Sequence, residues 1–266
     1  MEKVNIDGIN IAYERKGKGV PLVLVHGYPL DHTIWDEVVP TLAEEFDLII
    51  PDLRGFGASD VMEADDSIID YATDVAGLLT HLKIKKAYLV GHSMGGYIIL
   101  AFAREYPDRV LGVGMVSTQT LADTPERKEG RLATAKKVLA EGVGVVVESM
   151  TPKLSTDIRL QDKVRKLITQ QRPLGIFSAL NAMAERPDLT ELFMTFKFPT
   201  VIVHGVEDAL IPVERGREMK SALPSAHYLE LKEAGHLPMM ENPQAVADAL
   251  RFFVNVKFKS VKLLDR

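Results

Sequence analysis

One stretch of the chain decides the fold class, the sequence AYLVGHSMGG at residues 87–96. Its first four residues form a short apolar run, which is typical of a strand covered on both faces of a sheet. A helical pattern, Met94–Tyr106, begins directly after Ser93. The chain must therefore turn sharply between strand and helix, and Gly91 and Gly95 leave room for a strained backbone there. Such a turn projects Ser93 at the carboxyl edge of the sheet as a candidate nucleophile; the alternative is that Ser93 only caps the helix.

Buried strands alternate with helices along most of the chain. Apolar runs predict further strands at Val20–Val25, Leu48–Ile50, Val110–Val116, Val201–Val203 and, in a weaker alternating form, Tyr228–Leu231. Amphipathic patterns predict helices at His32–Glu45, Ser67–Leu82, Val213–Ala222 and Pro243–Val254. Residues 3–15 alternate polar and apolar around Asp7-Gly8, which predicts a β-hairpin. This alternation is typical of an α/β fold with a mostly parallel sheet and right-handed crossovers.

The interval between Val116 and Val201 contains no clear buried strand. We predict a helical cap insertion at 119–190, with Pro173–Glu185 as its last helix, on a core formed by 1–118 and 191–266. Residues 120–172 contain eleven Lys/Arg and seven Asp/Glu. The positive excess has two interpretations: solvated helix faces, or a lid whose local potential favours an anionic substrate.

Composition excludes several classes of protein. The chain has 266 residues, 46% of them hydrophobic and 26% charged, with a formal charge of −5 and no cysteine. Without cysteine there is no disulfide, thiol nucleophile or thiolate metal site. The acidic balance argues against nucleic acid as a partner. We also expect no secretory signal and no membrane span, because no apolar stretch of the necessary length occurs. The expected location is therefore cytoplasmic.

A serine hydroxyl becomes a good nucleophile only when a base takes its proton. Among seven histidines, His236 follows Ala234-Gly235 just beyond the strand that ends at Leu231. This position is the carboxyl edge of the last strand, where open α/β sheets build their sites. The other six end a strand, lie within the turn, occupy helices or lead into a strand: His26, His32, His81, His92, His204 and His227.

The base needs an acid to orient it. Asp208 lies in the loop after the strand Val201–Val203 and is expected to hold one ring nitrogen of His236. Glu207 is the local competitor, and a turn-forming role is the alternative for Asp208 itself. The chain order Ser93, Asp208, His236 is the order found in α/β-hydrolases.

A tetrahedral intermediate needs hydrogen-bond donors aimed at its developing negative charge. The turn supplies the backbone N–H of Met94, at the positive end of its helix. The loop after Val20–Val25 supplies the N–H of Tyr28, since Pro29 has none. The alternative for this loop is a plain turn that ends the strand.

These residues together resemble the α/β-hydrolase-fold superfamily across nearly the whole chain. The matching segments are His26-Gly27, residues 52–59 (DLRGFGAS), the serine turn, Gly205–Asp208 and Gly235-His236. The resemblance implies a mostly parallel eight-stranded sheet with helices on both faces and a helical cap. It is strongest to small carboxylesterases, enol-lactonases of the 3-oxoadipate type and cofactor-free haloperoxidases or perhydrolases. The loop at 52–59 shapes the sheet edge in that family.

We therefore predict a cofactor-independent serine hydrolase acting on a small ester or lactone, as a monomer or homodimer. No metal or dinucleotide motif is found. The alternatives are perhydrolysis or hydroxynitrile lyase chemistry with the same triad, and a small-molecule receptor on this fold. Haloalkane dehalogenases and epoxide hydrolases of the fold carry Asp where this chain has Ser93, which disfavours both.

The substrate is expected between the sheet edge and the insertion. Four apolar side chains are the candidates to line its pocket, with ordinary core packing as the alternative for each: Trp35, Met150, Phe177 and Met239. The basic, alternating tail at 256–262 has no functional interpretation.

Overall fold

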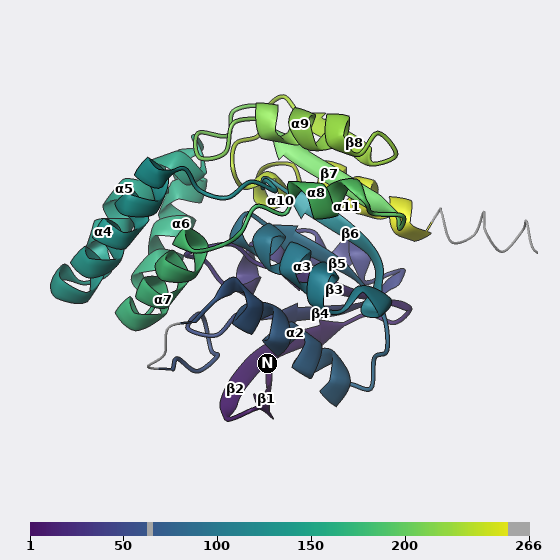
Figure 1. Cartoon of the computed structure of the whole chain (residues 1–266), viewed down its shortest axis with the longest axis horizontal. Coiled ribbons are helices and arrows are strands. Elements are labelled where there is room, and N and C mark those ends of the chain that lie inside the picture. Colours follow the sequence, from purple (N-terminus) through teal and green to yellow (C-terminus); the bar gives the residue numbers. More distant parts are fainter. Residues whose placement is uncertain (63–65, 255–266) are drawn as a thin grey trace, which may run out of the picture.

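The computed structural model describes residues 1–62 and 66–254 and has a twisted sheet with helices on both faces (Figure 1). Its strands are β1 (Glu2–Ile6), β2 (Ile9–Lys16), β3 (Val20–Val25), β4 (Phe46–Pro51), β5 (Ala87–His92), β6 (Val110–Val116), β7 (Thr200–Gly205) and β8 (His227–Leu231). They lie in the order β1-β2-β4-β3-β5-β6-β7-β8. The pairs β1–β2 and β2–β4 are antiparallel and all other pairs are parallel. The predicted eight-stranded, mostly parallel sheet is confirmed.

The antiparallel edge follows from the predicted hairpin. Ile6 pairs with Ile9, and Asp7 and Gly8 form the two-residue turn with φ of 50° and 95°. Positive φ at both central residues is the geometry that matches the right-handed twist of paired strands. The central strands β5 and β7 are buried along their whole length, as their apolar runs predict.

Helices cover both faces of the sheet. Outside the insertion they are η1 (His32–Trp35), α1 (Val39–Leu42), α2 (Ile68–His81), α3 (Met94–Glu105), η2 (Pro107–Arg109), α9 (Glu214–Ala222), α10 (Pro238–Glu241) and α11 (Pro243–Leu250). Helices α2 and α3 pack together over one face, and α1 and α11 contact each other over the opposite face (Figure 1). This double covering explains why the parallel strands are apolar on both sides.

The single helix predicted at His32–Glu45 is wrong. The segment forms the 3₁₀ helix η1 and, after a turn, the short helix α1. Asp31 caps η1 by accepting the N–H of Thr33. Pro40 lacks an N–H and is tolerated only in a first helical turn, so the helix has to restart at this point. The apolar periodicity is real, because Ile34, Trp35 and Leu42 are all buried, but two short elements share it.

The interval without strands is helical. Its helices are α4 (Pro125–Glu141), α5 (Gly144–Leu154), α6 (Ile158–Thr169), α7 (Pro173–Ala184) and the short α8 (Thr190–Met194). Four of them, α4 to α7, stand together to one side of the sheet, whereas α8 lies beside β7 (Figure 1). Helix α4 packs along α7 and α5 along α6. The basic tail predicted at 256–262 lies outside the described residues.

Gly175 fixes α7 against the loop that follows β4. A Cβ added at Gly175 would come within 2.1 Å of the carbonyl oxygen of Gly55, so the two backbones are in direct contact. Gly55 itself has a φ of +83°, which disfavours any other residue. This contact holds the last helix of the insertion at the sheet edge.

Substituting Gly175 tests that contact. Gly175→Ala should lower the free energy of unfolding by about 1–3 kcal/mol, because the added methyl group meets backbone that cannot yield. Gly130→Ala is the matched control: Gly130 also lies inside a helix of the insertion, and nothing lies within 4 Å of its added Cβ. That variant should be stabilised by about 0.5–1 kcal/mol through helix propensity. Equal urea midpoints for the two variants would contradict the close packing.

Candidate active site

Ser93 occupies a strained turn between β5 and α3. Its φ of 52° and ψ of −115° lie outside the regions that non-glycine residues ordinarily adopt. Two glycines make this turn possible: a Cβ on Gly91 would lie 2.2 Å from the oxygen of Gly95, and one on Gly95 would lie 2.4 Å from the oxygen of Val25. Larger residues at either position would push the serine out of place.

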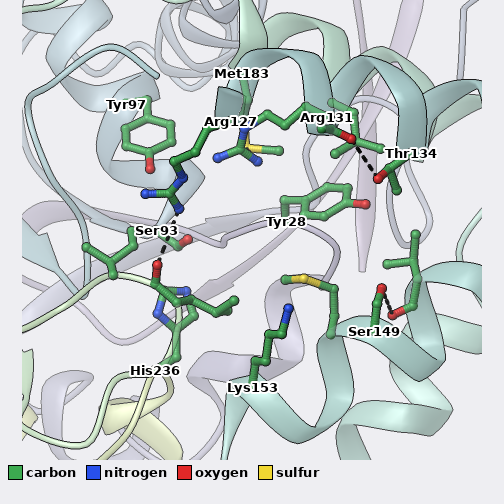
Figure 2. A pocket seen from close by; sticks show the side chains of 16 residues that line it. Tyr28, Ser93, Tyr97, Arg127, Arg131, Thr134, Ser149, Lys153, Met183 and His236 are labelled. Atoms are coloured by element: carbon green, nitrogen blue, oxygen red, sulfur yellow. Dashed lines mark hydrogen bonds between the residues drawn. The ribbon is translucent and has the colours of Figure 1, made fainter. Parts of the chain in front are cut away.

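The end of β6 holds the turn from the other side. The N–H of Ser93 donates to the carbonyl of Val116 at 2.9 Å, and the hydroxyl of Thr118 donates to the carbonyl of Ser93 at 2.7 Å. The Ser93 side chain makes no capping hydrogen bond to α3. The capping alternative for Ser93 is therefore wrong, and its hydroxyl opens onto a cavity (Figure 2).

His236 and Asp208 form a buried pair on the loops after β8 and β7. The Nδ1 atom of His236 lies 2.7 Å from Oδ2 of Asp208. The other carboxylate oxygen, Oδ1, accepts the N–H groups of Leu210 and Ile211, each at 2.9 Å. The competitor Glu207 is exposed. The structure thus brings Asp208, and not Glu207, to the ring of His236.

Electrostatics keep Asp208 ionised. Burial alone would raise the pKa of Asp208, but the charge of His236 and the hydrogen bonds from His204, His236 and the Ile211 amide together lower it below its ordinary value. An ionised carboxylate only accepts hydrogen bonds, so Nδ1 of His236 carries the proton. In the neutral form of the ring, Nε2 is then the acceptor. His236 and Ser93 line the same cavity (Figure 2), and no hydrogen bond joins them within the described part of the chain.

Two further histidines support the pair. The Nε2 atom of His92 lies 2.8 Å from the carbonyl oxygen of His236, and the Nε2 atom of His204 lies 2.8 Å from that of Ile211. Burial, together with the neighbouring charge of His236, lowers the pKa of His92 well below its ordinary value. His92 is therefore neutral at neutral pH and serves to position the loop of His236.

The loop after β3 packs directly on the serine turn. A Cβ on Gly27 would lie 2.9 Å from Cβ of Ser93, so only glycine fits there. Tyr28 follows Gly27 in the chain and Met94 follows Ser93, and neither backbone N–H donates a hydrogen bond to another described residue. Both N–H groups therefore have no protein partner, which an oxyanion donor requires.

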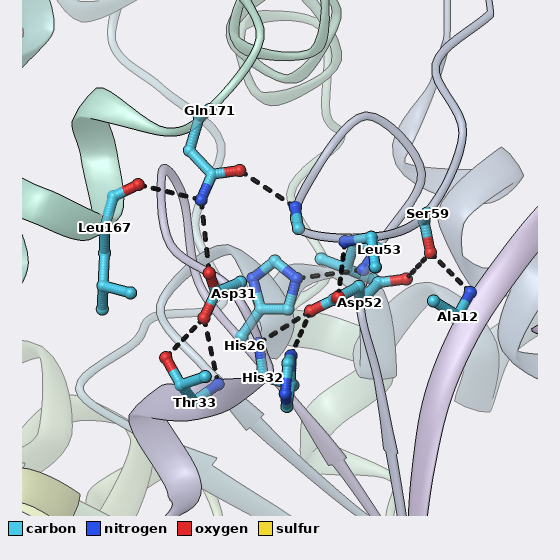
Figure 3. Close-up of polar contacts among 12 residues, drawn as sticks. Ala12, His26, Asp31, His32, Thr33, Asp52, Leu53, Ser59, Leu167 and Gln171 are labelled. Carbon is cyan, nitrogen blue, oxygen red and sulfur yellow. Dashed lines mark hydrogen bonds and ion pairs between the residues drawn. The ribbon is translucent and has the colours of Figure 1, made fainter. Parts of the chain in front are cut away.

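A polar network holds that loop in place (Figure 3). Nε2 of His26 accepts the N–H of Leu53 at 3.0 Å. Within the loop at 52–59, Asp52 accepts the N–H of His32 at 2.9 Å and that of Ala58 at 2.8 Å. The loop therefore shapes the edge of the site, as the resemblance implies.

The same network reaches the insertion through Gln171, at the end of α6. Its side chain accepts the N–H of Gly57 at 3.0 Å and donates to the carbonyl of Leu167 at 3.0 Å and to Asp31 at 3.4 Å (Figure 3). The loops after β3 and β4 are thus tied to the insertion by one buried amide.

Three residues of this network have the composition of a metal site. Asp31, His32 and Asp52 each offer one possible ligand atom, and these three atoms lie within 4.8 Å of one another. However, Asp52 accepts the Nδ1 hydrogen of His32 at 2.7 Å, and Asp31 accepts both the N–H and the hydroxyl of Thr33. These hydrogen bonds account for the cluster as loop support.

The cavity has a volume of about 330 Å³ and lies between the sheet edge and helices α4, α5 and α7. Of the four apolar candidates, Met150 lines this cavity. The expectation for the other three apolar candidates is wrong. Trp35 and Met239 are fully buried in the core, and Phe177, on α7, is half-buried against it; none is among the cavity-lining residues.

Sequence analysis missed most of the cavity wall. Tyr97 and Met183 line it together with Arg127 and Arg131 from α4 and Lys153 from α5. A signal for the two arginines existed: they are four residues apart, so they share one face of the basic helix. Nothing in the sequence indicated which face of that helix turns inward.

Comparisons with known proteins show which family the chain belongs to. Residues 20–243 match the family model of the alpha/beta hydrolase fold, so the chain belongs to that family. It is similar to a thermophilic esterase from Thermogutta terrifontis, solved with malate bound, at 38% identity and a TM-score of 0.92 over 96% of this chain and 98% of that chain. The enol-lactonase of Burkholderia xenovorans matches at 25% identity and a TM-score of 0.88, over 96% and 100%.

A curated relative is the pimeloyl-(acyl-carrier protein) methyl ester esterase of Aeromonas salmonicida, 25% identical over 92% of this chain and 100% of the relative. The chain is thus a hydrolase of the α/β fold with esterase and lactonase relatives. In addition, none of the helices formed by the described residues is both long enough and apolar enough to span a bilayer.

The lowered pKa of His92 has a consequence for stability. A histidine whose pKa is lowered by folding stabilises the protein above its unfolded pKa of about 6.5, and this stability is lost as the pH falls, because only the unfolded chain takes up the proton. Between pH 7 and pH 5 the loss reaches at most about 1.4 kcal/mol per pH unit for each such histidine. The variant His92→Gln should show a shallower fall in urea-unfolding free energy than the wild type.

The exposed residue His81 supplies the control, since His81→Gln should follow the wild-type pH dependence. If His92→Gln and the wild type lose the same free energy over this range, His92 is not held neutral by its surroundings.

Proposed function

We propose that the protein is a cofactor-independent serine hydrolase that cleaves a small carboxylic ester or lactone through an acyl-enzyme on Ser93. The observation that carries the proposal is the buried hydrogen bond of 2.7 Å between His236 and Asp208 at a cavity onto which Ser93 opens. The names of the relatives, two esterases and an enol-lactonase, support the same reaction class.

In the acylation step, Nε2 of His236 takes the proton of the Ser93 hydroxyl as Oγ attacks the carbonyl carbon of the substrate. The carbonyl oxygen becomes negatively charged, and the N–H groups of Tyr28 and Met94 donate to it. Asp208 stabilises the imidazolium that forms and keeps its ring in place. The strained turn at Ser93 fixes Oγ between the base and these two donors.

Collapse of the intermediate breaks the bond to the alkoxy oxygen, which receives the proton from His236. A water molecule then gives a proton to the same nitrogen and attacks the carbonyl carbon of the acyl-enzyme. As this second intermediate collapses, the bond to Oγ breaks and His236 returns the proton to Oγ, which releases the acid and free Ser93. When the substrate is a lactone, the alcohol freed from the ring stays covalently attached to the acyl group, so this hydrolysis releases a single ring-opened acid.

In this proposal, two parts of the chain have different roles. The core, 1–118 and 191–266, supplies every group that moves a proton or holds the oxyanion. The cap, 119–190, covers the cavity and contacts the parts of the substrate that do not react. Met150 and Met183 provide apolar surface there.

Replacing the nucleophile tests the mechanism. Ser93→Ala should lower kcat for p-nitrophenyl butyrate by at least about 10³-fold, because no other group in the site can form the acyl-enzyme. Ser149→Ala should keep multiple turnover: Ser149 lies in the same cavity, but its hydroxyl donates to the carbonyl of Val145 in its own helix at 2.8 Å. Turnover should be followed at equal concentrations of folded protein.

Retention of most of the activity in Ser93→Ala would remove Ser93 from the mechanism. If the wild type itself stops after about one turnover per molecule while it binds the ligand tightly, the protein is a receptor on this fold and not a hydrolase.

The acid of the triad can be tested against its neighbour in sequence. Asp208→Asn should lower kcat by about 10⁴-fold, because the amide favours the wrong tautomer of His236. Glu207→Gln should stay within about twofold of wild type, since the side chain of Glu207 is exposed and makes no hydrogen bond with the described residues. Similar rates for the two variants would contradict the assignment of Asp208.

A further inference from the structure

The charged side chains around the cavity all carry one sign. Arg127, Arg131 and Lys153 line it, and no Asp or Glu is among the lining residues. All three come from the insertion, Arg127 and Arg131 from α4 and Lys153 from α5. Figure 2 shows Arg127 and Lys153 reaching toward the cavity from different helices, with Ser93 and His236 on its other wall.

Arg131 already has a carboxylate partner. It forms an ion pair with Asp123, and Asp123 also pairs with Arg186 at 2.9 Å. The guanidinium of Arg186 in turn stacks over the ring of Tyr97 at 4.1 Å. Asp123 is therefore shared by two arginines, and this cluster keeps an excess of positive charge beside the cavity while it holds α4 in place.

Arg127 and Lys153 have no carboxylate partner among the described residues. The side chain of Arg127 makes one long hydrogen bond, from Nη2 to the carbonyl of Leu210 at 3.3 Å. The side chain of Lys153, on α5, makes no ion pair and no hydrogen bond with any residue in 1–62 or 66–254. The two side chains thus present cationic donors without carboxylate partners at the cavity that Ser93 also lines.

Two of the neutral hydroxyl groups in the cavity already donate their hydrogens elsewhere. The hydroxyl of Thr134 donates to the carbonyl of Gly130, and that of Ser149 to the carbonyl of Val145, both at 2.8 Å (Figure 2). Both hydroxyl hydrogens are therefore donated to backbone carbonyls of the same helix. The charged donors among the lining residues that have no carboxylate partner in the described part of the chain are the guanidinium of Arg127 and the ammonium of Lys153, and both favour a carboxylate. The hydroxyls of Tyr28 and Tyr97 line the same cavity as neutral donors.

We propose that Arg127 and Lys153 form a carboxylate-binding subsite, so that the preferred substrate is an ester or lactone bearing a free carboxylate in its non-reacting part. This inference rests on the proposed function and names its substrate class. It also selects between the two interpretations of the basic insertion: the lid favours an anionic substrate. A carboxylate in the cavity would bridge α4 and α5, which otherwise present like charges to the same space.

Matched substrates can test the subsite. The acyl-side pair is monomethyl glutarate and its neutral carboxamide analogue; the alcohol-side pair is butyryloxyacetate and butyryloxyacetamide. Within a pair the molecules differ by one charge at nearly constant shape. The wild type should prefer the carboxylate in one pair by about 10-fold or more in kcat/KM, the size expected of a charge-assisted hydrogen bond. Which pair shows the preference assigns the subsite to the acyl or the alcohol portion.

Substitutions then assign the preference to residues. Arg127→Gln, Lys153→Gln and the double variant should bring the carboxylate-to-amide ratio toward one. Lys137→Gln is the control, because it removes the same charge from α4 at a position away from the cavity. Lys137 is exposed and is not among the cavity-lining residues. The carboxylate-to-amide ratio of kcat/KM for the wild type should also fall as the salt concentration rises from about 20 to about 500 mM. Solvent ions can reach the two cations and screen their attraction for the carboxylate.

The outcomes separate this inference from the proposed function. A wild-type ratio near one in both pairs, with hydrolysis that still requires Ser93, overturns the subsite and leaves the hydrolase. A preference that survives in the double variant, or that falls equally in Lys137→Gln, overturns the assignment to Arg127 and Lys153. Failure to hydrolyse any of these esters and p-nitrophenyl butyrate as well overturns the proposed function itself.

Discussion

The rest of the site depends on one backbone constraint, the positive φ of 52° at Ser93. A non-glycine residue holds this conformation only when its surroundings impose it. Here the surroundings are glycine backbone on one side, with Gly95 against the end of β3, and the hydroxyl of Thr118 on the other. The sheet order places β3, β5 and β6 side by side, so the parallel strands themselves supply these contacts.

The candidate base depends on the same edge of the sheet. The loops after β7 and β8 bring Asp208 to His236, while His92, from the serine turn, contacts the carbonyl of His236. One histidine thus joins the loop of the nucleophile to that of the base, and burial keeps it neutral. The insertion is attached differently, by backbone contact at Gly175 and by the amide of Gln171, and its cations face the cavity without carboxylate partners apart from Arg131. In our proposal the core carries out the chemistry and the insertion selects the substrate.

Much of this could be predicted from the sequence because it depends on strand order. Ser93, Asp208 and His236 each follow a strand, and parallel strands end at one edge, so their proximity follows from the pattern. The prediction of a single helix at His32–Glu45 was wrong because the apolar periodicity continues across the point where Pro40 interrupts the helix. The prediction of the cavity-lining residues was incomplete for another reason. Hydrophobicity in the sequence does not distinguish Trp35, which is buried in the core, from Met150, which lines the cavity. Helix packing decides that difference, and it also decides that Arg127 and Lys153 turn inward.

The central claim is that Ser93 becomes acylated during turnover. The most direct measurement is acid quenching of the protein during hydrolysis of p-nitrophenyl butyrate, followed by peptide mass spectrometry. The account predicts a butyryl group on Ser93 that appears within the first turnover and disappears when the substrate is exhausted. Steady turnover with Ser93 unmodified at every time point, or with the acyl group on another residue, would contradict it.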